Sequence, residues 1–293
     1  MCHVEAHLAD ALDAASLADR ASLSRHHFHR VFAAHVGLSV AEFITYRRLQ
    51  RATQMLQGSA WPVAEVAWAV GYDTAQALAK AMRRELGVTP TQARGGAVLR
   101  WLRLPTPAAL PPTLSPQPIK PMQPVRFAHL PPGIQALTAT ARGMVGRSLS
   151  GAAQQAFGEL MDAAGRAGLL PRVRSCIALV PDDPEGPDDP QCRYVAGLVF
   201  GHNLATLQGA CEQPALPLRG SLAWWPLAPG RYAVFSHIGP YTTLHQAWDA
   251  IYRDWLPASG EKLRDVPPME LCLNSPADTP PEKLHTEIWL PLR

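Results

Sequence analysis

Residues 17–32 read LADRASLSRHHFHRVF, and residues 66–82 read VAWAVGYDTAQALAKAM. Each stretch begins with a short apolar helix and passes through a tight turn and a hydroxyl residue, Ser24 or Thr74. A second helix follows, with apolar residues four positions apart. This order of elements is typical of a helix-turn-helix, whose second helix can enter a DNA major groove. Because the pattern occurs twice, we predict an all-α domain with two such modules in the first third of the chain.

The composition fits a two-domain globular protein with unevenly distributed charge. The 293 residues carry a net charge of +3. Residues 1–104 hold 12 Lys and Arg against 8 Asp and Glu, whereas residues 105–293 hold 15 against 16. A basic front part fits a nucleic-acid-binding domain joined to a second domain of another kind.

The chain lacks the features of secreted, membrane-spanning or metal-binding proteins. It shows no signal-peptide pattern, and no apolar run reaches the ~18 residues of a membrane span. The five cysteines are scattered and no pair has CxxC spacing, so neither a zinc site nor a disulfide framework is indicated. We expect a cytoplasmic protein with reduced thiols, no membrane association, no metal and no cofactor.

Eight prolines between residues 105 and 124 separate the two halves. Such a density predicts an extended tether and therefore a domain boundary. We predict a DNA-binding domain over 1–97, a Pro-rich linker over 98–122 and a second domain over 123–293. In the first domain Ser16, Ser24, Ser39 and Thr74 are the predicted helix N-caps, and Gly87 is predicted to end the last long helix.

The outer faces of the two second helices are the predicted DNA-reading surface. On the first of them Phe28 and Phe32 point inward, which leaves arginines and histidines outside. Arg and His can reach base edges or phosphates, Gln can pair with adenine, Lys can bind guanine or phosphate, and Ala can touch a thymine methyl. The alternative, that these are only solvated helix faces, is weakened by the repetition. The candidates are Arg25, His26, His29, Arg30, Ala75, Gln76, Ala79, Lys80 and Arg83.

Over about residues 5–95 the chain resembles the AraC/XylS family of transcription regulators. Besides the two quoted stretches, the resemblance rests on residues 46–52, YRRLQRA, and on residues 87–90, GVTP. It implies two modules joined by one long helix, which read two successive major-groove segments of double-stranded promoter DNA. RNA polymerase is a further partner that this interpretation allows.

The second module departs from the pattern of the family more than the first. Ser22 stands where the family usually has the turn glycine of the first module. In the second module Leu78 and Met82 replace the usual phenylalanines, and Lys80 replaces the usual arginine. We therefore expect the first module to dominate sequence specificity.

The rear half also reads as a duplication. Residues from Gly133 to about Phe200 and from Gly230 to Leu292 each follow the order strand, helix, strand, strand. The helices are predicted over roughly Leu149–Gly165 and Thr242–Trp255. Two βαββ units side by side predict an α+β domain, with both helices on one face of the sheet and a cleft on the other.

This rear half resembles the GyrI-like effector-binding domain, an SHS2-type duplicated βαββ unit that follows the DNA-binding part of some AraC-type regulators. The matching stretches are GRYAVFSHIGPY at 230–241, MELCLN at 269–274 and TEIWLPL at 286–292. The resemblance covers about residues 125–293. It implies a pocket for lipophilic, often cationic, compounds that is lined by acidic and aromatic residues.

Side-chain alternation indicates which residues of the last strand could line such a pocket. Successive side chains of a strand point to opposite faces of the sheet. Thr286, Ile288 and Leu290 suit the helix-packed face, which leaves Glu287 and Trp289 on the cleft face. A carboxylate beside a tryptophan offers an organic cation both a charge partner and a ring face.

The same alternation is applied to the preceding strand. Met269, Leu271 and Leu273 are expected to pack inward, which leaves Glu270 and Cys272 on the cleft side with Glu287. The candidate ligand-binding residues are Glu270, Glu287, Trp289, Trp224, Trp225, Tyr194 and Tyr241.

Other tryptophans receive a structural interpretation. Trp224 and Trp225 are neighbours in one strand, so only one of them can line the cleft. Trp248 and Trp255, seven residues apart on a helix, are expected to form one buried stripe.

Three interpretations of the second domain remain. The first is a one-component regulator, in which a lipophilic cation binds this domain and alters DNA binding or the recruitment of RNA polymerase. The second is a ligand-independent activator whose second domain is a protein-interaction module, with Glu270 and Glu287 as ordinary solvent-facing strand residues. The third is a hydrolase of lipophilic compounds that uses one of these carboxylates with Tyr194. No GxSxG, HExxH, P-loop or GxGxxG motif is present, so we expect no enzyme.

Overall fold

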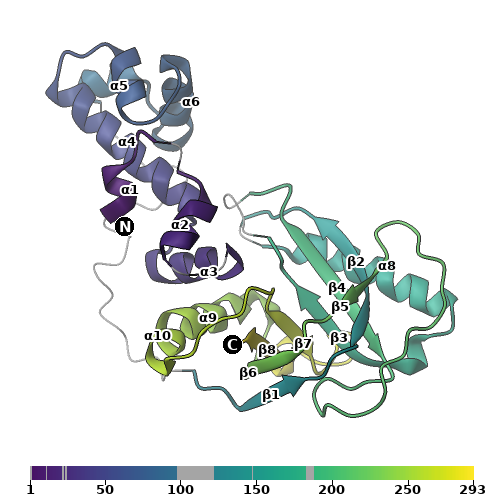
Figure 1. Cartoon of the computed structure of the whole chain (residues 1–293). Helices are drawn as coiled ribbons and strands as arrows, with labels where there is room; N and C mark the ends of the chain where they lie inside the picture. The colour runs from purple at the N-terminus through teal and green to yellow at the C-terminus, as the bar shows by residue number, and fades with distance from the viewer. Residues whose placement is uncertain are drawn as a thin grey trace. The chain divides into compact units, whose positions relative to one another are not determined.

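The computed structural model describes residues 2–10, 12–21, 23, 25–97, 122–146, 148–182 and 188–293 (Figure 1). The chain divides into two compact units, Met1–Ser22 with Val36–Gln117, and Leu23–His35 with Pro118–Arg293. Most of the predicted linker, residues 98–121, and the predicted cap Ser24 lie outside the described residues. Within the described residues, none of the helices combines the length and the apolar character that crossing a membrane requires.

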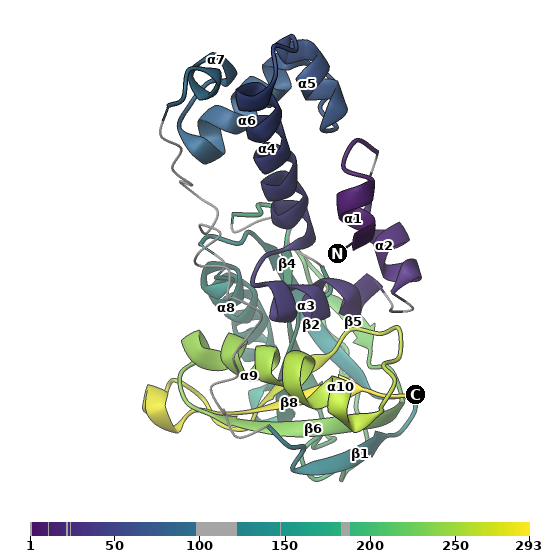
Figure 2. The ribbon, with the colours of Figure 1, turned by 90° about the vertical axis from the view of Figure 1, so that its left-hand side faces the viewer.

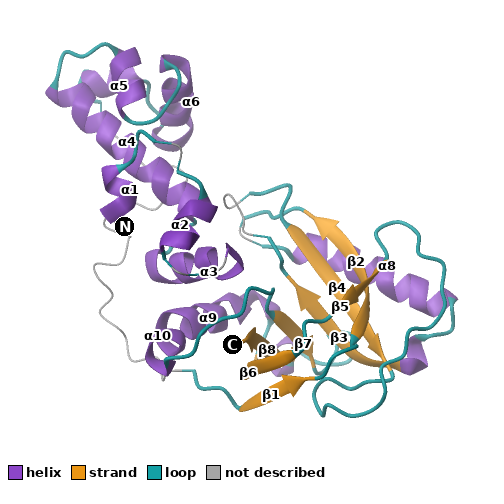
Figure 3. Cartoon of the chain, viewed as in Figure 1, coloured by secondary structure: helices purple, strands orange, loops and turns teal. Residues whose placement is uncertain are grey.

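The first unit is all-helical (Figure 3). A long helix forms its centre, and three shorter helices gather around the end of that helix (Figure 2). Leu49 and Leu56 of the long helix pack with Leu78 and Met82 of a neighbouring helix, and all four side chains are fully buried. The helices are α1 (Cys2–Ala6), α2 (Ala14–Arg20), α4 (Val40–Gly58), α5 (Val63–Ala69), α6 (Ala75–Leu86) and α7 (Pro90–Arg94).

The helix ends follow the predicted capping residues with one exception. Ser39 forms a capping box with Glu42 at the start of α4, and the Thr74 hydroxyl accepts the Ala77 N–H at 3.0 Å at the start of α6. Gly87 ends α6 in the left-handed conformation, with φ of 69°. The prediction for Ser16 is wrong, because the Asp13 carboxylate caps α2 by accepting the Ser16 N–H at 2.9 Å.

The turn of the second module requires glycine at position 71. Gly71 has a φ of 84°, and a Cβ there would lie 2.4 Å from the Leu8 carbonyl oxygen. Arg48 of α4 fixes the same place, since its Nε donates to that carbonyl at 2.9 Å and its guanidinium lies over the Tyr72 ring. Both the backbone conformation and the close approach therefore exclude other residues here.

The second unit is an α+β domain together with helix α3 (Arg25–Val36). Its strands are β1 (Arg126–Leu130), β2 (Gln135–Arg142), β3 (Val173–Leu179), β4 (Arg193–Phe200), β5 (Ala223–Pro226), β6 (Gly230–Ile238), β7 (Met269–Cys272) and β8 (His285–Pro291). Its longer helices are α8 (Ser150–Arg166) and α9 (Leu244–Ala250), and α9 continues through a π-helical turn (Ile251–Trp255) into α10 (Leu256–Ser259).

The eight strands form one antiparallel sheet in the order β1-β6-β8-β7-β3-β4-β2-β5. The units β2-α8-β3-β4 and β6-α9-β7-β8 are the two predicted βαββ repeats, and β3 and β7 join them at the centre of the sheet. The predicted duplication and the α+β class are thereby confirmed. The edge strands are exchanged, because β1 precedes β2 in the chain but pairs with β6, and β5 precedes β6 but pairs with β2.

Both helices cover the same face of the sheet, as predicted. Helix α8 packs on the core around Leu137 and Leu198, α9 packs on the core around Phe235 and Ile288, and the strand register places all four residues on one face. The expectation of a cleft on the opposite face is wrong. That face carries a buried core around Trp289, against which loop residues 204–211 pack.

Candidate functional site

Glu270 and Glu287, which were expected to share one site, lie on opposite faces of the sheet. In the pairing of β7 with β8, Glu270 lies opposite Ile288, and Glu287 lies opposite Leu271. Residues directly opposite each other in antiparallel strands share a face. Glu270 is therefore on the helix-covered face with Ile288, while Glu287 is on the other face with Leu271. The predicted faces of β8 are confirmed, and those of β7 are wrong.

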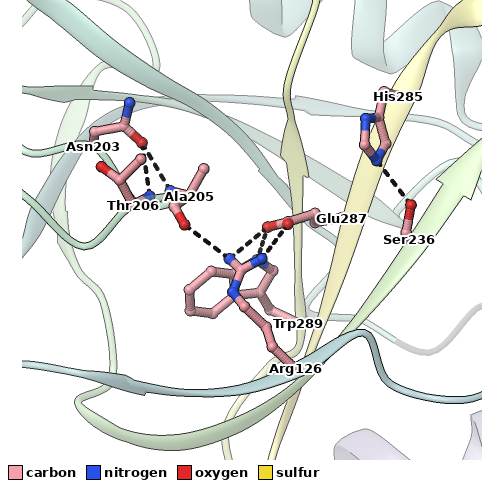
Figure 4. Close-up of polar contacts among 8 residues, drawn as sticks. All are labelled: Arg126, Asn203, Ala205, Thr206, Ser236, His285, Glu287 and Trp289. Carbon is pink, nitrogen blue, oxygen red and sulfur yellow. Dashed lines mark hydrogen bonds and ion pairs between the residues drawn. The ribbon is translucent and has the colours of Figure 1, made fainter.

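The Glu287 site consists of Glu287, Trp289 and Arg126, and its charges are satisfied within the chain (Figure 4). Both guanidinium Nη atoms of Arg126 donate to the two Glu287 oxygens, one of them at 2.9 Å. The Trp289 Nε1–H donates to the same carboxylate at 3.0 Å, and the guanidinium carbon lies 5.3 Å from the centre of the Trp289 ring. Glu287 is only 5% exposed and Trp289 is fully buried. Neither residue offers a free cation-binding surface.

A loop completes the Glu287 site. Arg126 Nη2 also donates to the Ala205 carbonyl at 3.1 Å. The Asn203 side-chain oxygen accepts the backbone N–H groups of Ala205 at 2.9 Å and Thr206 at 3.2 Å, which fixes the turn that presents this carbonyl (Figure 4). The site therefore joins β1, β8 and this loop as a structural element.

The Glu270 site consists of Glu270 with the aromatic and sulfur side chains around it on the helix-covered face. The Trp248 Nε1–H of α9 donates to the Glu270 carboxylate at 2.7 Å. Burial raises the pKa values of Tyr194 of β4 and of Tyr241, and the nearby charge of Glu270 adds to the rise in both. Glu270 and Trp248 are half-buried and Tyr241 is 42% exposed, so this site is more accessible than the Glu287 site.

Burial controls the protonation of the Glu270 site. It raises the pKa of Glu270 above the usual value, against the smaller opposing effects of the Trp248 hydrogen bond and the Arg30 charge. Burial, followed by the charge of Glu270, raises the pKa of Cys272 to about 12 and that of Tyr194 well above its usual value. The thiol and the phenol are therefore protonated near neutral pH, and Glu270 is the acid whose charge can vary.

Helix α3, the predicted DNA-reading helix of the first module, packs within the second unit. His27 is fully buried, its Nε2–H donates to the Arg264 carbonyl at 2.8 Å, and its Nδ1 lies 3.2 Å from the Tyr252 hydroxyl. Val31 and Ala34, one and two turns further along, pack on the core that includes Tyr252. The sequence interpretation, which left the histidines of this helix on its outer face, is wrong for His27.

Arg30 of α3 reaches the Glu270 site. Its Nη2 donates to the Val180 carbonyl at 2.9 Å, and its guanidinium carbon lies 5.0 Å from the centre of the Trp248 ring. Of the other predicted DNA-reading residues on this helix, His29 is half-buried, and the side chains of Arg25 and His26 lie outside what the structure describes.

Helix α6 presents its predicted reading face to solvent. Its buried side packs on the core of the first unit through Leu78, Ala81 and Met82. On the other side Gln76, Lys80 and Arg83 are exposed, while Ala75 and Ala79 are half-buried.

The remaining candidates for ligand binding are dispersed. Trp224 packs on the core under α8 and Trp225 on the core of the opposite face, so their predicted opposition is confirmed. Trp248, Arg30 and Arg126 belong to the two carboxylate sites, although none of them was predicted as a ligand-binding residue. No local pattern indicates the contact of Trp248 with Glu270, because the two residues belong to different elements. Only the strand pairing, which places Glu270 on the face covered by α9, would have indicated it. Among the described residues, no group of three or more His, Cys, Asp and Glu could hold a metal ion.

Two family descriptions match separate parts of the chain. Residues 132–293, more than half of the chain, match the GyrI-like small molecule binding domain. Residues 17–96 match a helix-turn-helix domain. These matches agree with the two resemblances drawn from the sequence.

Curated relatives match over part of their length. The probable transcriptional regulator YgiV of Escherichia coli K12 is 35% identical over 85 residues, which are 29% of this chain and 52% of YgiV. The transcriptional activator RhaS of Escherichia fergusonii is 31% identical over 93 residues, which are 32% of this chain and 34% of RhaS. The chain thus spans about half, or less, of the length of these relatives.

Solved structures match each part separately. The DNA-binding domain of AdpA in complex with a target DNA is 32% identical, with a TM-score of 0.32, over 32% of this chain and 86% of that chain. An uncharacterized conserved protein from Listeria innocua is 13% identical, with a TM-score of 0.39, over 59% of this chain and 94% of that chain. Because the first of the two family descriptions matches more than half of the chain, the chain belongs to the GyrI-like small molecule binding domain family, and it carries a helix-turn-helix domain over residues 17–96.

Proposed function

We propose that this regulator senses a lipophilic organic cation at the Glu270 site and reads promoter DNA with α3 and α6. The observation that carries the proposal is the pairing of Glu270 with Trp248. A half-buried carboxylate fixed by an indole N–H at 2.7 Å supplies a charge partner beside an aromatic face, which is the combination that binds organic cations. Tyr194 and Tyr241 add further aromatic surface close to it.

The choice between the two carboxylates rests on what each already binds. Glu287 is buried and bonded by both guanidinium nitrogens of Arg126. An incoming cation would have to break this ion pair inside the core, which costs several kcal/mol. Glu270 is more accessible, so we assign the ligand to Glu270 and a structural role to Glu287, Trp289 and Arg126.

The DNA-binding role uses the outer faces of the two reading helices. On α6 the exposed Gln76, Lys80 and Arg83 suit base edges and phosphates. On α3 the corresponding residues are Arg25, His26, His29 and Arg30. We propose that the protein acts in the cytoplasm, with RNA polymerase as the partner that converts promoter binding into regulation, and that residues 98–122 link a DNA-binding domain to the sensing domain.

The test uses the full chain and two probes of matched size and opposite charge, tetraphenylphosphonium and tetraphenylborate. Titration calorimetry should show saturable binding of the phosphonium and much weaker binding of the borate. Glu270→Gln removes the charge but keeps an acceptor for Trp248, and should weaken phosphonium binding by about tenfold or more, as expected for the loss of a charge-assisted contact. Glu282→Gln, at an exposed position, is the control and should bind as the wild type does.

Two results would contradict the proposal. Equal affinity for the two probes would show that charge does not govern binding. An absence of saturable phosphonium binding would instead favour a second domain that binds another protein.

A further inference from the structure

Arg30 occupies the Glu270 site in the way a bound organic cation would. Its guanidinium lies over the Trp248 ring, the ring whose N–H is bonded to Glu270. Burial raises the pKa of Glu270, and the charge of Arg30 opposes this rise. We propose that Arg30 is the resident, intramolecular ligand of the Glu270 site, and that an external cation competes with it and thereby releases α3. This inference rests on the proposed function, and it adds the regulation of the same site.

The residues of α3 that contact the rest of the second unit lie along one side of the helix. His27, Arg30, Val31 and Ala34 are three or four residues apart and therefore lie on one side of the helix. His27 is fully buried with hydrogen bonds to Tyr252 and to the Arg264 carbonyl, and Val31 and Ala34 pack on the adjacent core. Arg30 is the charged member of this set, and its guanidinium lies over the Trp248 ring that is assigned to the ligand.

One side chain cannot serve two partners at once. Arg30 is a predicted base-reading residue of the first module, but in the docked helix its guanidinium donates to the Val180 carbonyl and faces Trp248. A docked α3 therefore cannot present Arg30 to a base edge. An external cation at Glu270 removes the attraction that Arg30 contributes to docking.

The direction of the coupling follows from this competition. The external cation binds when Arg30 has left the site, and DNA contact by Arg30 also requires that it has left. Both ligands favour the released helix, so each should raise the affinity for the other by the same factor. The structure thus assigns the cation the role of promoting DNA binding by the first module.

The competition also sets the apparent affinity for the cation. If only a fraction of the molecules has Arg30 out of the site, the measured dissociation constant of the cation equals the intrinsic one divided by that fraction. Removing the resident cation should therefore strengthen binding of the external one, by about fivefold or more if the coupling is of ordinary size.

The first experiment is calorimetry of the full chain with tetraphenylphosphonium, without DNA. Arg30→Ala and Arg30→Gln should both bind the probe about fivefold or more tightly than the wild type does. The glutamine variant keeps a donor for the Val180 carbonyl and so isolates the charge. His35→Ala is the matched control, because His35 lies on the same helix, is exposed and bonds only to the Val31 carbonyl of its own helix within the contacts described. Its affinity should equal that of the wild type.

A second measurement follows the helix itself. Amide hydrogen exchange of the peptide covering residues 25–36 should become faster in the wild type when phosphonium is added. In Arg30→Gln it should be fast before any addition, and in His35→Ala it should follow the wild type.

The outcomes separate this inference from the proposed function. Phosphonium binding that depends on Glu270, with unchanged affinity in both Arg30 variants and unchanged exchange in 25–36, overturns the inference and leaves the proposed function standing. Absence of phosphonium binding in the wild type and in both Arg30 variants overturns the two together. Tighter binding in the Arg30 variants with faster exchange of α3 supports both.

Discussion

The Glu287 and Glu270 sites contain the same three groups. In each, an indole Nε1–H donates to a carboxylate, at 3.0 Å in one and 2.7 Å in the other, and an arginine guanidinium lies over that indole. The difference is where the arginine comes from. Arg126 belongs to a strand of the same sheet and bonds both carboxylate oxygens, whereas Arg30 belongs to α3 and bonds the Val180 carbonyl.

This difference teaches that the chemistry of a site does not fix its role. When all three groups are parts of one sheet and are buried, they stabilise the fold. When the cation is on a helix for which we propose a second role in reading DNA, we expect the same groups to form a site that can exchange its occupant.

The largest expected effect is on stability in Arg126→Ala. The variant leaves the buried Glu287 carboxylate without its cation, and breaking a buried pair in this way should lower the free energy of unfolding by about 3 kcal/mol. Urea denaturation of the full chain measures the change. Arg30→Ala serves as the comparison and should cost less than about 1 kcal/mol, because its site is more accessible. Equal losses in the two variants would remove the distinction between the sites.

A smaller difference is expected between the two carboxylate-to-amide variants. Glu287→Gln should lower the free energy of unfolding by about 1.5 kcal/mol, since it weakens hydrogen bonds to a charged partner. Glu270→Gln should be neutral or slightly stabilising, because burial already disfavours the charge of Glu270, as its raised pKa indicates. Thermal melts of both variants test this, and a larger loss in Glu270→Gln would contradict it.

The affinity for an organic cation should rise with pH. The pKa of Glu270 is raised above its ordinary value of 4.5, so the carboxyl remains protonated, and binds cations weakly, at pH values where a free glutamate is already charged. Tyr194, Tyr241 and Cys272 have raised pKa values and remain neutral in that range. Calorimetry with phosphonium from pH 4.5 upward should show the rise, and Glu270→Gln should abolish it.

The titration of Glu270 also determines how the stability of the protein changes with pH. Above pH 4.5 the folded state holds a proton on Glu270 that the unfolded chain has lost. The contribution of this group to stability should therefore fall as the pH rises through the raised pKa. A contribution that increases with pH, obtained by subtracting the profile of Glu270→Gln, would contradict the direction of the pKa shift.

The smallest expected effect concerns the two indoles. Trp248→Phe removes the N–H donor to Glu270 and provides a weaker ring for a cation, so phosphonium affinity should fall by about two- to threefold. Trp289→Phe should leave that affinity unchanged, because Trp289 lies on the other face of the sheet. Calorimetry distinguishes the two, and an equal loss in both variants would argue against the Glu270 site as the place of binding.

Sequence patterns predicted the elements and their order better than the site. Duplication and alternation within β8 were sufficient for the βαββ repeats and for the faces of Ile288 and Glu287. Alternation within β7 was read correctly as two sets of residues, but the sets were placed on the wrong faces. The face of a strand depends on which residue it opposes, and the opposition of Glu270 to Ile288 is a non-local property of the pairing.

The role of Trp248 was hidden for a related reason. Its spacing from Trp255 predicted a common buried stripe, and both residues do border the core under α9. A π-helical turn over Ile251–Trp255 separates them, however, and Trp248 is half-buried with its N–H on Glu270. Arg30 was likewise assigned to DNA from its helix alone, since no local pattern indicates packing against residues more than a hundred positions away.

The exchanged edge strands bear on how the second unit folds. The edge strand of each βαββ half comes from the segment that precedes the other half, because β1 pairs with β6 and β5 pairs with β2. In addition, β8 is the last strand in the chain but lies between β6 and β7. Most of the sheet therefore depends on pairings between distant segments, which makes folding slow and the transition cooperative. The central pairing of β3 with β7 can form only after β7 has been made, so during synthesis the two halves of the second unit are joined at the centre of the sheet at a late stage.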